Sequence, residues 1–166
     1  RNIFLEEKKQ IIEIKALGFS KCRMSLAVPR EAEYRGLDYF KGQCIATSYP
    51  IILKNFLDKR NISADVHKIS GSVEIAPGIG LSSGIFDIVS TGSTLISNGL
   101  KEVETVLHSE AILVGKKDLD QEKNKLIEQL LFRIEAVLAG KNNKYVQIWR
   151  DMGRFRTDLR IHGFRE

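Results

Sequence analysis

Cysteine and histidine are scarce in this sequence, which holds two cysteines and three histidines among 166 residues. Cys22 and Cys44 each stand alone in an apolar stretch, without a second cysteine or a histidine at metal-ligand spacing. The histidines are scattered and share no motif: His67, His108 and His162. Because free cysteine is usually interior, we expect two buried structural thiols and no zinc site.

Long hydrophobic runs are also missing. No apolar segment approaches the roughly 20 residues that a membrane helix requires, and the first seven residues are too acidic for a secretory signal. The composition, 43% hydrophobic and 28% charged, is typical of a globular protein with one or two compact lobes. We therefore place the chain in the cytoplasm, with no membrane partner.

The formal charge of +5 is a mild excess, and it is unevenly spread. The last twenty residues hold five arginines against three acids, which gives that tail +2. An excess of this size suits an anionic ligand or a solvated surface, and it is too small to indicate a nucleic-acid partner.

Strand-like and helix-like patterns alternate along most of the chain, which predicts an α/β sheet with helices on its faces. We expect a polar connection at 30–41 and a helix end at Gly140. The nearly continuous apolar run 85–89 suits a strand buried on both faces of a parallel sheet. The expected strands are 22–28, 42–46, 64–69, 85–89, 102–107 and 110–114, and the expected helices are 51–59, 76–84 and 121–139.

One local theme, a strand followed by a hydroxyl-rich turn and a helix start, occurs twice. The first copy, at 46–50, offers a hydroxyl cap and places Pro50 in the first helical turn. Both turns would point N–H groups and hydroxyls out of the carboxyl end of a strand, where open α/β sheets bind ligands. Thr47, Ser48 and Tyr49 are therefore candidate cleft residues.

The second copy of this theme contains the turn Ser90, Thr91, Gly92, Ser93 and Thr94. Glycine lets the backbone approach an anion, and a helix start supplies free N–H donors. This chemistry suits a phosphate monoester, although a turn of this composition is also typical of a plain loop with a helix cap.

Two acids upstream of this turn make the phosphate interpretation more specific. Asp87 lies near the end of an apolar strand, where an unpaired carboxylate costs several kcal/mol unless something binds it. One interpretation is that Asp87 caps a loop or pairs with a buried arginine. The other is that Glu74 and Asp87 accept hydrogen bonds from ligand hydroxyls while the turn holds a phosphate.

A wider set of residues resembles a known signature: an acid, a glycine, a small residue, an aliphatic-x-acid strand, and then Ser/Thr-Gly-x-Thr-Leu. It comprises Glu74, Gly80, Ser82, Ile85, Asp87, Thr91, Gly92, Thr94 and Leu95. This pattern is similar to that of the ATP phosphoribosyltransferases, which catalyse the first step of histidine biosynthesis. Segments 23–27 and 45–50 are also similar, and the resemblance covers about 17–146.

The resemblance implies phosphoribosyl diphosphate and ATP as substrates, with Mg²⁺ as cofactor. It assigns Ser90, Thr91, Gly92, Ser93 and Thr94 to the 5-phosphate. Glu74 and Asp87 would meet the ribose hydroxyls. It identifies no catalytic residue and no metal ligands, and it implies a homo-oligomer for the full-length protein.

The resemblance also implies a two-lobed α/β fold of the type II periplasmic-binding-protein kind. We expect 1–20 to end the first lobe, 21–109 to form a complete second lobe, and 110–146 to return to the first lobe. Residues 147–166 remain unassigned. In this interpretation the chain is an internal fragment without the N-terminal part or a regulatory domain, and it has little transferase activity alone.

Two other interpretations stay open at this stage. The same architecture serves small-ligand-binding modules of the periplasmic-binding-protein type, and specific binding of phosphoribosyl diphosphate would argue against such a module. Alternatively, the chain is an inactive or interaction-only fragment, with its arginine-bearing tail as a contact surface.

Overall fold

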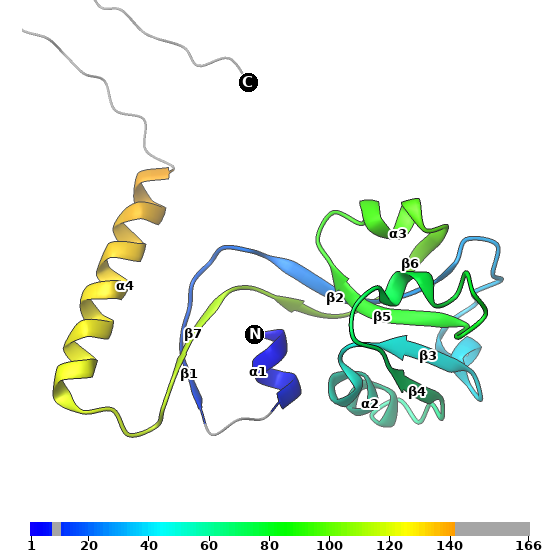
Figure 1. Cartoon of the computed structure of the whole chain (residues 1–166), viewed down its shortest axis with the longest axis horizontal. Coiled ribbons are helices and arrows are strands. Elements are labelled where there is room, and N and C mark those ends of the chain that lie inside the picture. The colour runs from blue at the N-terminus through cyan, green and yellow to red at the C-terminus, as the bar shows by residue number, and fades with distance from the viewer. Residues whose placement is uncertain (8–10, 142–166) are drawn as a thin grey trace, which may run out of the picture. The chain divides into compact units, whose positions relative to one another are not determined.

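The computed structural model describes residues 1–7 and 11–141 (Figure 1). The chain divides into one compact unit, 1–118, and a second that begins at Leu119. Expectations for 147–166, and for the last residues of the segment 110–146, lie outside the described residues. The strands are β1 (Ile12–Ala16), β2 (Cys22–Pro29), β3 (Cys44–Thr47), β4 (Asp65–Lys68), β5 (Gly84–Val89), β6 (Leu100–Ser109) and β7 (Ile112–Gly115). The helices are α1 (Asn2–Glu7), α2 (Pro50–Asp58), α3 (Ser93–Ser97) and α4 (Gln121–Lys141), with short 3-10 turns η1 (Leu37–Phe40) and η2 (Val73–Ile75).

In the described chain, the central feature is a five-stranded mixed sheet of order β4-β3-β5-β2-β6. Strand β3 runs parallel to β4 and β5, whereas β2 runs antiparallel to β5 and β6. The expected α/β sheet is confirmed, and segment 85–89 does bury residues on both faces, although Ile88 is 40% exposed. The expectation of a parallel sheet is wrong, because β5 runs parallel to β3 but antiparallel to its other neighbour, β2.

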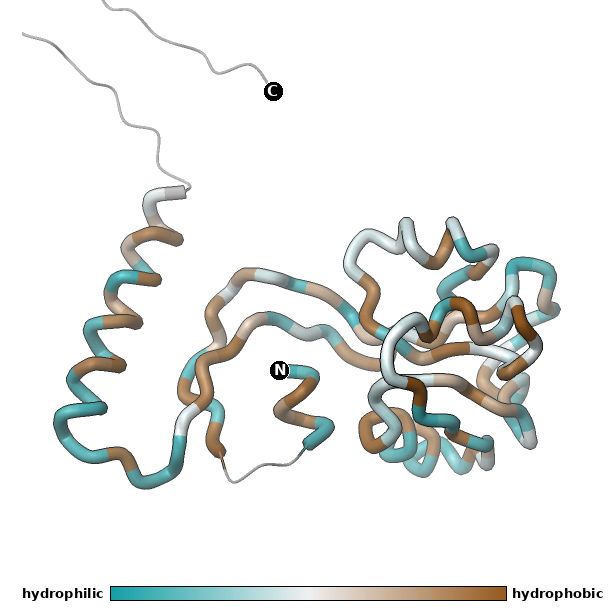
Figure 2. The backbone as a smooth tube through the Cα atoms, viewed as in Figure 1, coloured by the Kyte–Doolittle hydropathy of each residue, from teal (hydrophilic) through white to brown (hydrophobic). Residues whose placement is uncertain are grey.

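Each face of this sheet has its own apolar core. Figure 2 shows hydrophobic residues, in brown, recurring along the strands of the sheet. Helix α2 and η1 supply residues to the first core, which includes Leu26, Phe40 and Phe86. The second core, under η2 and α3, includes Ile85 and Leu95. Successive strand residues alternate between the faces, so Ile85 and Phe86 enter different cores.

Strands β1 and β7 pair antiparallel in a separate two-stranded sheet. Helix α1 contacts α2, and the Glu6 carboxylate accepts hydrogen bonds of 2.9 Å from the backbone N–H groups of Ile51 and Ile52. Pro50 lies in the first turn of α2, as its position predicts. The expectation of a hydroxyl cap is wrong, because Glu6 satisfies those N–H groups from 45 residues away.

Four further expectations need correction. Segment 76–84 is not helical, because η2 ends at Ile75 and Gly80 adopts a φ of +75°. The connection at 30–41 contains η1, which buries Phe40 completely. Helix α4 passes through Gly140 instead of ending there. Both cysteines are half-buried, and burial raises the pKa of the Cys44 thiol.

The second unit contains α4, which the apolar periodicity of 121–139 predicts and the structure confirms. Asp120 caps its first turn by accepting a hydrogen bond of 2.8 Å from the backbone N–H of Lys123. None of the helices in the described ranges is both long and apolar enough to cross a membrane.

Candidate functional site

The two hydroxyl-rich turns lie at the same edge of the sheet. Strands β3 and β5 pair in parallel, with Thr47 opposite Phe86, so their carboxyl ends point the same way. The turn after β3 leads into α2, and the turn after β5 leads into α3. This edge is where parallel strands usually bind ligands.

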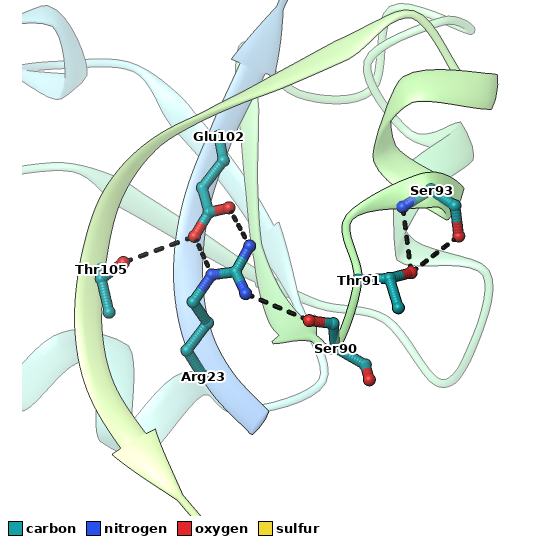
Figure 3. Close-up of polar contacts among 6 residues, drawn as sticks. All are labelled: Arg23, Ser90, Thr91, Ser93, Glu102 and Thr105. Atoms are coloured by element: carbon teal, nitrogen blue, oxygen red, sulfur yellow. Dashed lines mark hydrogen bonds and ion pairs between the residues drawn. The ribbon is translucent and has the colours of Figure 1, made fainter. Parts of the chain in front are cut away.

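The Ser90–Thr94 loop joins β5 to α3. Gly92 has a φ of +86°, a left-handed conformation that favours glycine. The hydroxyls of Thr91 and Ser93 hydrogen-bond at 2.9 Å (Figure 3). Among the described residues, the backbone N–H groups of Thr91, Gly92 and Thr94 donate to no other group. The loop therefore has an exposed set of donors for an acceptor from outside the chain.

The N-terminus of α2, in contrast, is already occupied. Its N–H groups at Ile51 and Ile52 donate to Glu6, a negatively charged carboxylate. An anionic ligand there would have to displace this acid, so the loop after β5 is the better anion site.

The two acids named from the sequence come close enough to influence each other. Burial raises the pKa of the Asp87 carboxyl above its ordinary value, and the negative charge of Glu74 raises it further. Asp87 accepts a hydrogen bond of 2.8 Å from the N–H of Ile88 but forms no ion pair within 1–7 and 11–141. The interpretation that a buried arginine neutralises Asp87 therefore finds no support.

The hydroxyls of two candidate cleft residues after β3, Thr47 and Ser48, already form hydrogen bonds within the chain. Thr47 is buried, and its hydroxyl accepts the N–H of Tyr49 at 2.9 Å. The Ser48 hydroxyl donates to the carbonyl of Ile69 at 2.8 Å. Burial raises the pKa of Tyr49, as does the negative charge of Asp87, so Tyr49 lies within electrostatic range of that acid.

An ion pair between Arg23 and Glu102 contacts the first residue of the loop. The sequence had assigned this pair no role. Arg23 on β2 donates from Nε and Nη2 to the two Glu102 carboxylate oxygens, each at 2.6 Å (Figure 3). Its Nη1 donates to the Ser90 carbonyl at 3.1 Å. Arg23 and Glu102 are 79 residues apart, so no local sequence pattern indicates the pairing.

Glu102→Gln should lower the melting temperature at neutral pH, and the gap to the parent should close in acid. Hydrogen bonds from Arg23 lower the pKa of Glu102 from 4.5 to about 2. A lowered native pKa stabilises the fold above about 4.5, and this contribution is lost as pH falls toward 2. Thermal melts followed by circular dichroism between pH 2 and 7 would measure it.

Glu33→Gln is a matched control, because Glu33 pairs with Arg35 at 3.1 Å while their side chains are 82% and 86% exposed. Exposed pairs contribute little, so this variant should melt close to the parent at every pH. A constant gap for Glu102→Gln down to pH 2 would contradict the role given to the Arg23 pair.

Magnesium has a limited set of candidate ligands. Among the described residues, no group of three His, Cys, Asp or Glu side chains is placed to hold a metal. Mg²⁺ is usually held by one or two carboxylates together with substrate phosphates, so a magnesium site does not need a group of three protein ligands. Glu74 and Asp87 fit a requirement for one or two carboxylates, because they are neighbouring acids and no cation of the described chain pairs with Asp87.

Comparison with known proteins identifies the family. The family model described as ATP phosphoribosyltransferase matches residues 1–136. The ATP phosphoribosyltransferase of Phocaeicola vulgatus is 59% identical over 145 residues, which are 87% of this chain and 51% of that protein. The enzyme of Azobacteroides pseudotrichonymphae is 61% identical with the same coverage. The chain thus spans about half the length of these relatives.

Solved structures agree with this result. The ATP phosphoribosyl transferase (HisG:HisZ) complex from Thermotoga maritima matches with a TM-score of 0.70 and 26% identity, over 84% of this chain and 67% of that chain. An ancestral arginine-binding protein bound to glutamine matches at 0.60 and 15% identity, over 82% and 61%. The latter shows the fold alone and confirms the α/β architecture of the periplasmic-binding-protein type. The chain belongs to the ATP phosphoribosyltransferase family.

Proposed function

We propose that this chain carries the phosphoribosyl-diphosphate site of an ATP phosphoribosyltransferase. In that reaction the N1 atom of the ATP adenine bonds to the anomeric carbon of the ribose, and the bond from that carbon to diphosphate breaks. The observation that supports the proposal best is the placement of two neighbouring acids, Glu74 and Asp87, beside a loop with free N–H donors.

The loop Ser90–Thr94 would hold the 5-phosphate. Within the part of the chain that the structure describes, the N–H groups of Thr91, Gly92 and Thr94 donate to no acceptor, and phosphate oxygens accept hydrogen bonds well. Helix α3 has only five residues, so the backbone donors and hydroxyls matter more here than the helix dipole. Three residues of strand span roughly 10 Å, and this spacing supports a bound sugar phosphate with its phosphate at the loop and its ribose near Asp87.

Glu74 and Asp87 would accept hydrogen bonds from the ribose 2- and 3-hydroxyls. Hydroxyl donors relieve the cost of a half-buried carboxylate, and this cost is visible as the raised pKa of Asp87. The same two negative charges favour positive charge on the ribosyl carbon as diphosphate leaves. The site then works by alignment and electrostatics, without a covalent intermediate.

Bound Mg²⁺ would neutralise negative charge on the departing diphosphate. No residue in the described part of the chain has to act as a general base in this proposal.

The wider proposal concerns the whole protein. Segment 21–109 would be the complete second lobe, with 1–20 and 110–146 belonging to the first. ATP would bind with help from residues beyond this chain, together with Thr47, Ser48 and Tyr49 at the cleft. We also propose that the whole protein assembles as a homo-oligomer.

Asp87→Asn should weaken sugar-phosphate binding and stabilise the free chain at neutral pH. A ligand at about 100 times its Kd raises the stability of the parent by about 2.7 kcal/mol, and loss of hydrogen bonds to a charged group should weaken binding tenfold or more. The pKa of Asp87 is raised in the fold, so the parent loses stability as pH rises above 3.8. The Asp87→Asn variant does not lose stability in this way, because asparagine carries no ionisable group.

Melting curves with Mg²⁺ and phosphoribosyl diphosphate, and with glutamine or arginine instead, measure both effects. Asp65→Asn is the control, because Asp65 is an exposed strand aspartate on β4. Equal ligand shifts in the parent and Asp87→Asn would reject the role of Asp87. A response to amino acids rather than to the sugar phosphate would favour a binding module.

A further inference from the structure

Arg23 contacts the loop at its first peptide. It lies on β2 opposite Val89, the last residue of β5, so its side chain starts where the loop begins. Nη1 donates to the Ser90 carbonyl at 3.1 Å, while Nε and Nη2 are held by Glu102 (Figure 3). The Arg23 guanidinium thus hydrogen-bonds both to Glu102 on β6 and to the first residue of the loop.

The same guanidinium lies close to Gly92, at the centre of the loop. Its Nη2 is 3.9 Å from the position that a Gly92 Cβ would occupy. The loop itself has few internal ties: the Thr91–Ser93 hydroxyl contact at 2.9 Å and a long one of 3.4 Å from the Ser93 N–H to Thr91 Oγ1. At its far end the loop is held by α3, because the Gly92 carbonyl accepts the N–H of Ile96 at 3.2 Å and the Thr94 carbonyl accepts that of Asn98 at 3.3 Å. At its first peptide, the contact that holds it is the one from Arg23.

Only arginine meets this geometry. Its planar fork presents several N–H donors in fixed directions, so it can bind a carboxylate with two donors and a carbonyl with a third. A lysine ammonium at the same place is a point charge and cannot hold both partners in one plane. Glu102 keeps its charge at neutral pH and orients the fork, and Thr105 donates to Glu102 at 3.4 Å.

We propose that Arg23, oriented by Glu102, is a positioning residue that fixes the Ser90–Thr94 loop in its phosphate-binding conformation. The part about phosphate rests on the proposed function, whereas the part about loop order does not. Arg23 acts through the Ser90 carbonyl and need not touch the substrate. Loss of the arginine should loosen the loop selectively and weaken binding of a phosphate-bearing sugar.

The first experiment measures backbone NMR order parameters of the ligand-free 166-residue chain. In Arg23→Met, loop amides 91–94 should fall from the rigid range of about 0.85 to below about 0.6, while β5 stays rigid. Arg23→Lys should behave like Arg23→Met, because it keeps the charge but loses the fork. Unchanged loop order in Arg23→Met, or full rescue by lysine, would overturn the proposal.

Lys101→Met is the matched control. Lys101 on β6 also donates to a backbone carbonyl, that of Ala32 at 2.7 Å, without contacting the loop. Removing this contact should leave the order of amides 91–94 unchanged. If Lys101→Met loosened the loop as much as Arg23→Met, the effect would be general destabilisation and the positioning role would be rejected.

The second experiment titrates the same chains with ribose 5-phosphate. Binding by Arg23→Met and Arg23→Lys should be about tenfold weaker than by the parent, the loss expected for a missing charge-assisted contact. Equal affinity of the parent and both variants would overturn the proposed link to phosphate. If the parent itself did not bind the sugar phosphate, the proposed function would fail, and the order parameters would still decide the positioning role.

Discussion

Phe86→Ala should lower the free energy of unfolding by about 3–5 kcal/mol, which is the usual cost of truncating a buried phenylalanine. Phe86 is fully buried on β5, opposite Leu26 and Thr47 of the neighbouring strands. Its ring fills the core beneath α2, where the methyl of alanine would leave a large void. Since domains are stable by roughly 5–15 kcal/mol, much of the margin would be lost.

Urea unfolding followed by circular dichroism would measure this loss. Phe19→Ala is the control, because the same atoms are removed from a side chain that is 39% exposed. We expect the Phe19 variant to lose clearly less stability than the Phe86 variant, since about two fifths of the Phe19 surface already contacts water in the fold and its removal leaves no closed void. Similar losses in the two variants would mean that Phe86 is not a core residue in solution.

Phe86 also bears on the site, because Asp87 follows it directly. The core on one face holds Phe86 in place, and this fixes the next side chain on the opposite face, where Ser25 lies in register with Asp87. The position of an acid that is costly to bury is thus set by apolar packing on the other side of the same strand.

Local pattern predicts the elements of this fold well and their arrangement less well. The apolar runs identify β2 and β5, and Pro50 marks the start of α2. The antiparallel direction of β2 could not be predicted, because strand direction depends on the path of the connection and not on composition. The cap of α2 escaped prediction for a similar reason, since Glu6 reaches it from a different segment.

The predicted loop and acids show the same limit at the scale of the site. Glycine and hydroxyl content indicates an anion loop at 90–94, and an acid inside an apolar strand singles out Asp87. No local sequence pattern of this kind indicates the Arg23–Glu102 pair, because the two residues are 79 positions apart. Two irregularities in the β2–β6 register, between Met24 and Ser25 and between Leu26 and Ala27, lie between the strand positions of the two residues. A pair such as Arg23 and Glu102 can therefore be recognised only once the strands are assembled into the sheet.

Gly84→Ala should destabilise the chain by about 1–3 kcal/mol, toward the upper end of that range for an added methyl group in a packed core. A Cβ at Gly84 would lie 2.9 Å from the Ala27 carbonyl oxygen and 2.9 Å from Phe40 Cε1. The carbonyl belongs to β2, which cannot move without disturbing its pairing with β5 and β6. The glycine therefore lets the start of β5 pass close to β2 and to the ring of Phe40.

Gly78→Ala makes the identical chemical change where there is room for it. The nearest atom to a Cβ at Gly78 is the Ile75 carbonyl oxygen, at an ordinary 3.5 Å, and the backbone has no left-handed φ. Removing a glycine at such a position usually changes stability by less than about 1 kcal/mol and often raises it, because the unfolded chain loses freedom. Thermal melts of both variants should separate clearly, with Gly84→Ala below the parent and Gly78→Ala level with it or above. If both variants matched the parent, the start of β5 would be more loosely packed against β2 and Phe40 than the structure indicates.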